Sequence, residues 1–164
     1  MKRLILIRHA KSDWSDLDAT DHERTLNERG RQSATVMGEW MRTHDLLPDH
    51  VLCSDAARTQ ETLARLRFGD VPTTYTHSLY LAEPDVMLRL LRKRTEDCVM
   101  LIGHNPGSAM LAEMLVAKAP PHPDFDRFPT GATAVLDFEI DSWRDLTTGR
   151  GACPLFEVPR ALMQ

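Results

Sequence analysis

The sequence predicts an α/β fold in which helices cover a mostly parallel sheet. Short apolar runs of strand length at 3–7, 51–54, 98–102 and 133–140 alternate with segments of helical periodicity, which is the pattern of α/β proteins. Three of these runs lead into turns that carry Arg or His side chains. Because open α/β sheets bind ligands at the carboxyl ends of their strands, we expect the three turns to meet in one site.

The first three strands are predicted from continuous apolar runs. The run at 3–7 is typical of a strand buried on both faces, and it stops at Arg8 and His9. The run at 51–54 leads into Asp-Ala-Ala-Arg-Thr-Gln-Glu-Thr, which is typical of the opening of a helix, and the run at 98–102 leads into Gly-His-Asn-Pro-Gly. Each strand is therefore expected to deliver polar side chains to the same edge of the sheet.

The first helix is predicted to begin near Thr25 and to end at Pro48. The sequence Thr-Leu-Asn-Glu at its start fits a capping box, in which the first and fourth side chains bond each other's backbone N–H groups. Ala34, Met37 and Met41 recur at helical spacing and form an apolar stripe. We expect this stripe to pack on the sheet.

Three further helices and a pair of strands complete the predicted order. A second helix is expected over about 55–67, a third begins at Pro84, and a fourth opens at Pro106, since proline is favoured in the first turn of a helix. The segments 133–140 and 152–158 flank a turn-rich stretch. They are expected to form a hairpin or two edge strands.

Length and composition limit the function classes. A chain of 164 residues fits one domain with one core, predicted to span 1–164, and its 42% hydrophobic and 27% charged residues are ordinary for a soluble protein. The net charge of −4 provides no basic footprint for nucleic acid. The apolar run before Arg8 is too short for a secretory signal, and no run approaches the ~20 residues of a membrane helix. We expect a cytoplasmic protein with neither nucleic acid nor membrane as partner; the oligomeric state is left open.

The cysteines give no sign of a structural cross-link. Cys53, Cys98 and Cys153 are odd in number, widely spaced and outside any Cys-x-x-Cys pair. This pattern speaks against a disulfide framework and against a zinc site. Reduced thiols packed as small apolar side chains are expected instead.

Five motifs follow one another along the chain. They are Arg-His-Ala-Lys-Ser-Asp-Trp at 8–14, Asp-His-Glu-Arg-Thr-Leu-Asn-Glu-Arg-Gly at 21–30, Ser-Asp-Ala-Ala-Arg-Thr-Gln-Glu-Thr at 54–62, Gly-His-Asn-Pro-Gly at 103–107 and Thr-Gly-Ala at 130–132. In this order they resemble the histidine phosphatase superfamily, in particular its small bacterial phosphohistidine phosphatases of the SixA type. The resemblance spans nearly the whole chain and implies a three-layer α/β/α sandwich with a mixed, mostly parallel sheet like that of phosphoglycerate mutase.

The resemblance implies roles for four residues. His9 would be the nucleophile that becomes a transient phosphohistidine, and a neutral imidazole is available for this at neutral pH. Arg8 and Arg58 would hold phosphoryl oxygens in bidentate contacts that lysine cannot copy, and His104 would donate to the phosphoryl group. Because these groups supply the charge stabilisation that phosphoryl transfer needs, neither a metal nor a cofactor is expected.

Two more residues have roles that the sequence leaves open. Arg24 either binds phosphate near the pocket mouth or forms a structural salt bridge with Asp21. Glu83 is the nearest candidate for a general acid, but it also fits as an acidic residue favoured by the dipole at a helix N-terminus. The longer acid-bearing segment of the larger superfamily members is missing, which suits a labile P–N bond better than an alkyl ester. The remaining histidines lack such a context and are expected to make ordinary polar contacts: His22, His44, His50, His77 and His122.

The leading hypothesis is a metal-independent phosphatase that hydrolyses phosphohistidine, in a protein or a small phosphoramidate, through a covalent intermediate on His9. One alternative is a general small-molecule phosphomonoesterase, in which Glu83 would matter. Another is a non-catalytic module that binds phosphate or a phosphopeptide in the same pocket. A phosphoglycerate mutase is disfavoured, because the chain offers little room for a closing lid.

Overall fold

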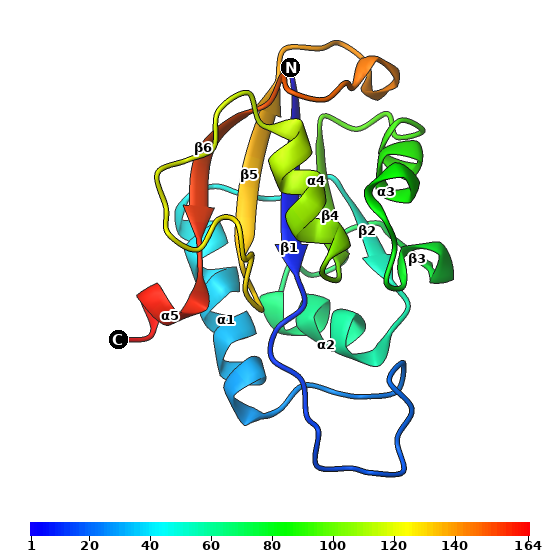
Figure 1. Ribbon diagram of the computed structural model, residues 1–164, viewed down its shortest axis with the longest axis vertical. Helices are drawn as coiled ribbons and strands as arrows, with labels where there is room; N and C mark the ends of the chain where they lie inside the picture. The colour runs from blue at the N-terminus through cyan, green and yellow to red at the C-terminus, as the bar shows by residue number, and fades with distance from the viewer.

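A single six-stranded sheet with helices on both faces organises the computed structural model, which describes residues 1–164 (Figure 1). The strands are β1 (Lys2–Arg8), β2 (His50–Ser54), β3 (Thr73–Thr76), β4 (Cys98–Gly103), β5 (Thr133–Phe138) and β6 (Ala152–Glu157). The α-helices are α1 (Glu28–Thr43), α2 (Ala57–Leu66), α3 (Pro84–Leu91), α4 (Gly107–Leu115) and α5 (Pro159–Leu162). Two short 3-10 helices are η1 (His77–Leu79) and η2 (Trp143–Asp145).

The sheet is mixed but mostly parallel, as the sequence predicts. Its strand order is β3-β2-β4-β1-β5-β6. The first four strands run parallel to one another, whereas β5 is antiparallel to β1 and β6 is antiparallel to β5. The antiparallel pairing of β5 with β6 confirms the predicted C-terminal strand pair.

The layers follow from the two apolar faces of β1. Leu4 and Leu6 pack in a core shared with α3 and α4, while Ile5 and Ile7 pack in a second core shared with α1 and α2. Figure 1 shows α3 and α4 in front of the sheet and α1 and α2 behind it. The three-layer α/β/α arrangement is therefore confirmed. No helix has the length and apolar character needed to cross a membrane.

The register of the parallel strands brings the three polar turns together. Arg8 at the end of β1 lies opposite Gly103 at the end of β4, and Cys53 of β2 lies opposite Ile102 of β4. The strands thus end level with one another. Because they are parallel, the segments that follow them leave the sheet at the same edge.

The start of α1 differs from the prediction. The helix begins at Glu28, and Asn27 is its N-cap, with Asn27 Oδ1 accepting from the Gly30 N–H at 2.8 Å. Thr25 is still extended, because its carbonyl accepts from the Asp13 N–H at 2.8 Å and the neighbouring Leu26 forms a β-bridge with Ser12. The capping box predicted at Thr25 is therefore wrong.

One strand lacks the apolar run that marks the others. The strand β3 reads Thr-Thr-Tyr-Thr, is partly exposed and lies at the edge of the sheet. An edge strand with solvent on one side needs no apolar run, which explains why periodicity does not reveal it. Its position matters because η1, directly after it, approaches the site.

Candidate active site

The carboxyl ends of β1, β2 and β4 border an open pocket of about 470 Å³. The lining contains all four residues that the resemblance singled out: Arg8, His9, Arg58 and His104. His9, Arg58 and His104 are buried although they are polar. Burial of such groups is costly unless they find hydrogen-bond partners or a ligand, so their contacts reveal what the pocket can do.

A turn at Gly131 fixes the backbone of Arg8 and His9. The Gly131 N–H lies 3.1 Å from the Arg8 carbonyl and 3.0 Å from the His9 carbonyl, and the Arg8 N–H donates to the carbonyl of Ala132 at 3.1 Å. Gly131 has a φ of +76°, and a Cβ there would collide with the ring of Pro159. The Thr-Gly-Ala motif thus holds the two residues that end β1.

The contacts of His9 define its tautomer. Its Nδ1 lies 2.7 Å from the carbonyl oxygen of Ala10, which can only accept, so Nδ1 carries the proton. Nε2 is left with its lone pair and accepts from Arg58 Nε at 3.4 Å. Burial, reinforced by the positive charges of Arg8 and Arg58, lowers the pKa of His9 to about 3. The ring is therefore neutral at physiological pH, and its Nε2 lone pair is engaged only by the long contact from Arg58 Nε.

His104 faces His9 across the pocket. The two ring centroids are 5.3 Å apart, with an interplanar angle of 53°. His104 Nε2 lies 2.7 Å from Ser54 Oγ, while its buried Nδ1 has no hydrogen-bond partner. Burial lowers the pKa of His104 to about 3, with the nearby Arg58 charge acting in the same direction. His104 is thus a neutral ring with one unused polar atom.

Ser54 is the hydrogen-bond partner of His104 Nε2. Its Oγ accepts from the Ala56 N–H at 3.3 Å, and its hydroxyl proton is available to donate to His104 Nε2. This pattern favours the tautomer with a proton on Nδ1. The unpartnered atom of His104 is then a hydrogen-bond donor.

Arg8 supplies a second donor without a partner. Its Nη1 donates to the carbonyl of Phe128 at 3.3 Å, but its buried Nε has no acceptor. Burial lowers the pKa of Arg8, and the charge of Arg58 lowers it further. An anion in the pocket would accept hydrogen bonds from the unpartnered nitrogens of Arg8 and His104. Its negative charge would also offset the repulsion between Arg8 and Arg58.

Asp21 is the carboxylate of the pocket, and the sequence suggested it only as a possible ion-pair partner of Arg24. Its Oδ2 accepts from Arg58 Nη2 at 3.0 Å and from the hydroxyl of Tyr80, while its Oδ1 accepts from Arg24 Nη2 at 3.0 Å. The bond from Tyr80, joined by those from both arginines, holds the pKa of Asp21 far below that of an ordinary carboxyl group. Asp21 is therefore ionised throughout the physiological range.

The structure places Arg24 where both of its predicted roles are possible. It lines the pocket, is buried, and forms the ion pair with Asp21. Its Nη1 also donates to Ser12 Oγ, and its guanidinium carbon lies 3.5 Å from the ring centroid of Trp14. These contacts hold Arg24 at the mouth of the pocket.

Tyr80 reaches the site through a close approach of two backbones. A Cβ at Gly107 would collide with the carbonyl of Ala82, so only glycine lets residues 80–82 lie against the start of α4. The Tyr80 ring then contacts His104 edge-on, with centroids 5.4 Å apart. Periodicity and motifs gave no signal for Tyr80, because its role arises from packing between distant segments.

Glu83 lies apart from these groups. It is exposed, serves as the N-cap residue of α3 without a side-chain capping bond, and is not among the residues that line the pocket. The nearest lining residue of its segment is Leu81. The structure thus brings Arg8, His9, Arg58, His104 and Arg24 together and leaves Glu83 outside.

A second cleft of about 300 Å³ adjoins the pocket, and Lys11 and Thr130 line both. Lys11, Arg29, Arg127 and Arg160 contribute four positive charges to this cleft, whereas Asp124 is its one acid. This positive surface stands out on a chain whose net charge is −4. It would attract an anionic group on a molecule bound in the pocket.

Comparisons with known proteins agree with this geometry. Residues 4–80 match the model of the histidine phosphatase superfamily (branch 1). An uncharacterised protein of Mycobacterium tuberculosis (strain H37Rv) is 34% identical over 161 residues, which cover 94% of this chain and all of that protein.

Two solved structures are similar over almost their whole length. A candidate phosphohistidine phosphatase SixA from Nakamurella multipartitia superposes with a TM-score of 0.84 at 30% identity, covering 96% of each chain. A second such SixA protein, from Agrobacterium tumefaciens, has a TM-score of 0.78 at 29% identity and covers 96% of this chain and 98% of its own. Together with the pocket, these matches show that the chain is a phosphatase of the histidine phosphatase superfamily and belongs to its SixA-type branch.

Proposed function

We propose that this phosphatase hydrolyses phosphohistidine and that His9 carries the phosphoryl group between two half-reactions. One observation carries the proposal. The neutral His9 presents its Nε2 lone pair in a pocket where Arg8 Nε and His104 Nδ1 lack partners. A nucleophile and two unused donors are the groups that an incoming phosphoryl group requires.

In the first half-reaction, the lone pair of His9 Nε2 attacks phosphorus as the P–N bond of the substrate breaks. The electron pair of that bond stays on the leaving imidazole nitrogen, which takes a proton from solvent. Arg8, Arg58 and His104 would donate to the phosphoryl oxygens, where charge is dispersed in the transition state. The product of this step is phosphohistidine at His9.

In the second half-reaction, water attacks phosphorus and the bond to His9 Nε2 breaks. The electron pair returns to Nε2, the water proton passes to solvent or phosphate, and inorganic phosphate leaves. The Ala10 carbonyl keeps the proton on Nδ1 through both steps, so the same nitrogen is regenerated as nucleophile.

The lack of a proton donor among the acidic side chains near the pocket favours a substrate with a P–N bond. The carboxylate that lines the pocket, Asp21, has a pKa far below neutrality and cannot donate a proton at pH 7. Glu83 lies outside the lining. An alkyl ester needs a proton for its poor leaving group, whereas an imidazole leaving group is protonated readily by solvent. The site therefore favours phosphoramidates over phosphomonoesters.

The adjoining basic cleft supports a phosphorylated protein as substrate. Its four cations lie beside the catalytic pocket, and they are exposed at an open surface. A free phosphate or a small phosphoramidate bound in the pocket would meet at most Lys11, which lines both surfaces, and would leave the three arginines of the cleft unused. A protein with acidic side chains around its phosphohistidine would use both surfaces.

The test is to compare wild-type protein with His9→Ala on a histidine-phosphorylated protein and on a phosphomonoester. We expect wild type to favour the phosphohistidine, and His9→Ala to lose activity on both. Denaturation in alkali shortly after mixing with labelled substrate should trap acid-labile phosphate on wild type and none on the variant. His44→Ala, which removes an exposed histidine at the C-cap of α1, is the matched control.

Three results would contradict the proposal. Acid-stable label would indicate an ester intermediate on another residue. A higher rate on the phosphomonoester would favour the small-molecule phosphomonoesterase. Binding of the phosphoprotein without turnover would identify a non-catalytic phosphate-binding module.

A further inference from the structure

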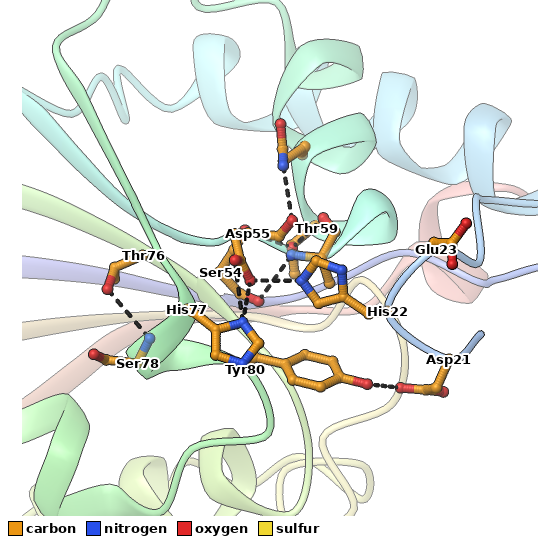
Figure 2. A network of polar contacts seen from close by, with 12 residues as sticks. Asp21, His22, Glu23, Ser54, Asp55, Thr59, Thr76, His77, Ser78 and Tyr80 are labelled. Atoms are coloured by element: carbon orange, nitrogen blue, oxygen red, sulfur yellow. Dashed lines mark hydrogen bonds and ion pairs between the residues drawn. The ribbon is translucent and has the colours of Figure 1, made fainter.

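Three residues beside the catalytic pocket bring metal-binding atoms together (Figure 2). The ligand atoms of His22, Asp55 and His77 all lie within 4.8 Å of one another. His22 Nε2 is 2.7 Å from Asp55 Oδ1, and His77 Nδ1 is 3.1 Å from Asp55 Oδ2. We propose that these two imidazoles and this carboxylate bind a divalent transition-metal ion such as Zn²⁺.

The three ligands come from three separate segments of the chain. His22 lies in the loop before α1, Asp55 follows β2, and His77 begins η1 after β3. No local spacing links them, which is why only ordinary polar contacts are expected of His22 and His77 from the sequence. The fold alone assembles the cluster, so a metal-binding motif is not visible in the sequence.

Hydrogen bonds hold the backbones of the ligands in place. The Ala57 N–H donates to the carbonyl of His22 at 3.0 Å, which ties the loop before α1 to the start of α2. Gln60 Nε2 donates to the carbonyl of Asp55 at 2.8 Å. The site would therefore lose little conformational freedom when an ion binds, which favours affinity.

The Tyr80 ring packs against both imidazoles. Its centroid lies 4.9 Å from that of His22, which it meets edge-on, and 5.4 Å from that of His77. Figure 2 shows the two imidazoles directed at the Asp55 carboxylate, with the Tyr80 ring beside them. Both rings are thus held with a nitrogen facing the same carboxylate.

The donor set selects the class of metal. Imidazole and carboxylate ligands suit zinc and its first-row neighbours, whereas magnesium and calcium prefer oxygen alone. Zinc is often bound by three protein ligands, with water in a fourth position, at distances of about 2.0–2.2 Å. Ligand atoms in such a site lie roughly 3.3 Å apart. The present separations from Asp55 are 2.7 to 3.2 Å and all ligand atoms lie within 4.8 Å of one another, so binding requires shifts of the side chains that bring the two imidazole nitrogens to a common centre.

Access and proton balance are compatible with binding. The side chains of His22, Asp55 and His77 are 36%, 30% and 72% exposed, so an ion and its water can reach them. In the metal-free form the facing ring nitrogens hydrogen-bond the carboxylate. On binding, each imidazole gives its lone pair to the ion, and any proton on that nitrogen moves to the other ring nitrogen or to solvent.

A bound ion would connect segments that also hold the catalytic groups. His22 follows Asp21, which contacts Arg58, and Asp55 follows Ser54, which contacts His104. The ion would thus brace one wall of the pocket without contacting the phosphoryl group. The proposal is independent of the choice of substrate, because it predicts a property of the resting protein.

The experiment measures zinc binding directly. Untagged full-length protein is stripped with a chelator, freed of it, and titrated with Zn²⁺ in competition with a chromophoric chelator. Wild type should bind one Zn²⁺ per chain at this site. His77→Ala and Asp55→Ala should each weaken binding by more than the roughly 10- to 100-fold that loss of an outer-shell partner costs. His44→Ala removes a histidine elsewhere and should leave the affinity unchanged.

A second readout separates lost ligands from a damaged fold. His77 is largely exposed, so His77→Ala should unfold at the wild-type temperature when no metal is present. A hundredfold excess of Zn²⁺ over its Kd should raise the melting temperature of wild type by about 5 to 10 °C, and that of His77→Ala much less. Equal zinc affinity in wild type and His77→Ala, or no binding by folded wild type, would overturn the proposal.

Discussion

Arg58 and Asp21 form a two-point contact at the centre of the pocket. Arg58 Nη1 donates to the backbone carbonyl of Asp21 at 2.6 Å, and Nη2 donates to its carboxylate at 3.0 Å. The third nitrogen, Nε, points to His9 Nε2 at 3.4 Å. One planar guanidinium thus links the loop before α1 to the proposed nucleophile, and this geometry leads to the first two predictions.

Arg58→Lys should reduce kcat/KM by at least ~100-fold although the positive charge remains. Lysine has a single nitrogen and cannot reach Asp21 and His9 at once, and each lost charge-assisted bond is worth about 1.5–3 kcal/mol. The measurement is steady-state hydrolysis of a phosphohistidine substrate. Arg65→Lys, on the same helix but half-exposed and away from the pocket lining, should stay within about 2-fold of wild type. A mild effect of Arg58→Lys would mean that charge alone suffices.

Asp21→Asn should separate phosphate affinity from turnover. Removing this carboxylate takes a negative charge away from Arg58 and Arg24, so inorganic phosphate should inhibit a few-fold more tightly. The same change weakens the contact that orients Arg58, so kcat should fall by roughly 10-fold. The exposed Asp18→Asn is the control. Weaker inhibition by phosphate would show that Asp21 helps phosphate to bind.

The low pKa of His9 predicts a flat acid limb in the pH profile. A histidine with an ordinary pKa near 6.5 would lose about 30-fold of its neutral form between pH 7.5 and pH 5. With its pKa lowered to about 3, His9 stays neutral over this range. The value of kcat/KM, which reports the free enzyme, should therefore fall less than 3-fold after correction for substrate ionisation. A steep decline with a midpoint near 6.5 would show that His9 titrates normally.

Burial of the neutral His104 should make the free energy of unfolding depend on pH. His104 has a folded-state pKa of about 3, below its unfolded value, so the unfolded chain binds more protons as the pH falls below about 6.5. Its contribution lowers the unfolding free energy by about 1.4 kcal/mol per pH unit between pH 6 and 4. His104→Gln should flatten the measured slope by that amount. The unfolding free energy is measured by urea titration at each pH. An unchanged pH dependence in His104→Gln would show that His104 is already protonated in the folded state over this range.

Much of the fold could be predicted because its strands are buried on both faces. The apolar runs that became β1, β2 and β4 carry their own signal, and their parallel register places Arg8, Arg58 and His104 at one edge. The edge strand β3 and the start of α1 could not be predicted in this way. Both depend on pairing with distant backbone rather than on local periodicity.

The site also divides into residues that the sequence predicts and residues that only the tertiary structure reveals. His9, Arg8, Arg58 and His104 lie in motifs next to strand ends, so their meeting follows from topology. Tyr80 has no motif, and Asp21 was noted only as a neighbour of Arg24. They enter the site because Gly107 allows a close approach to Ala82 and because the loop before α1 bends over α2. Contacts of this kind are set by tertiary packing and leave no pattern in the sequence.

The exposed position of Glu83 leads to the last prediction, which concerns the leaving group. Glu83 is the N-cap residue of α3, makes no side-chain capping bond and does not line the pocket. Glu83→Gln should therefore change kcat/KM by less than about 3-fold on a phosphoramidate, far short of the ~100-fold or greater loss typical of an essential general acid. Glu113→Gln, an exposed site on α4, is the control.

Parallel measurements on a phosphomonoester decide what a larger effect would mean. If Glu83→Gln reduces ester hydrolysis 100-fold while leaving the phosphoramidate unaffected, Glu83 must reach the pocket when an ester binds, and its proton matters only for the poorer leaving group. If both substrates lose activity together, Glu83 is a general acid, and the small-molecule phosphomonoesterase becomes the better description. If neither changes, solvent protonates the leaving nitrogen, as expected for a pocket whose lining carboxylate, Asp21, remains ionised.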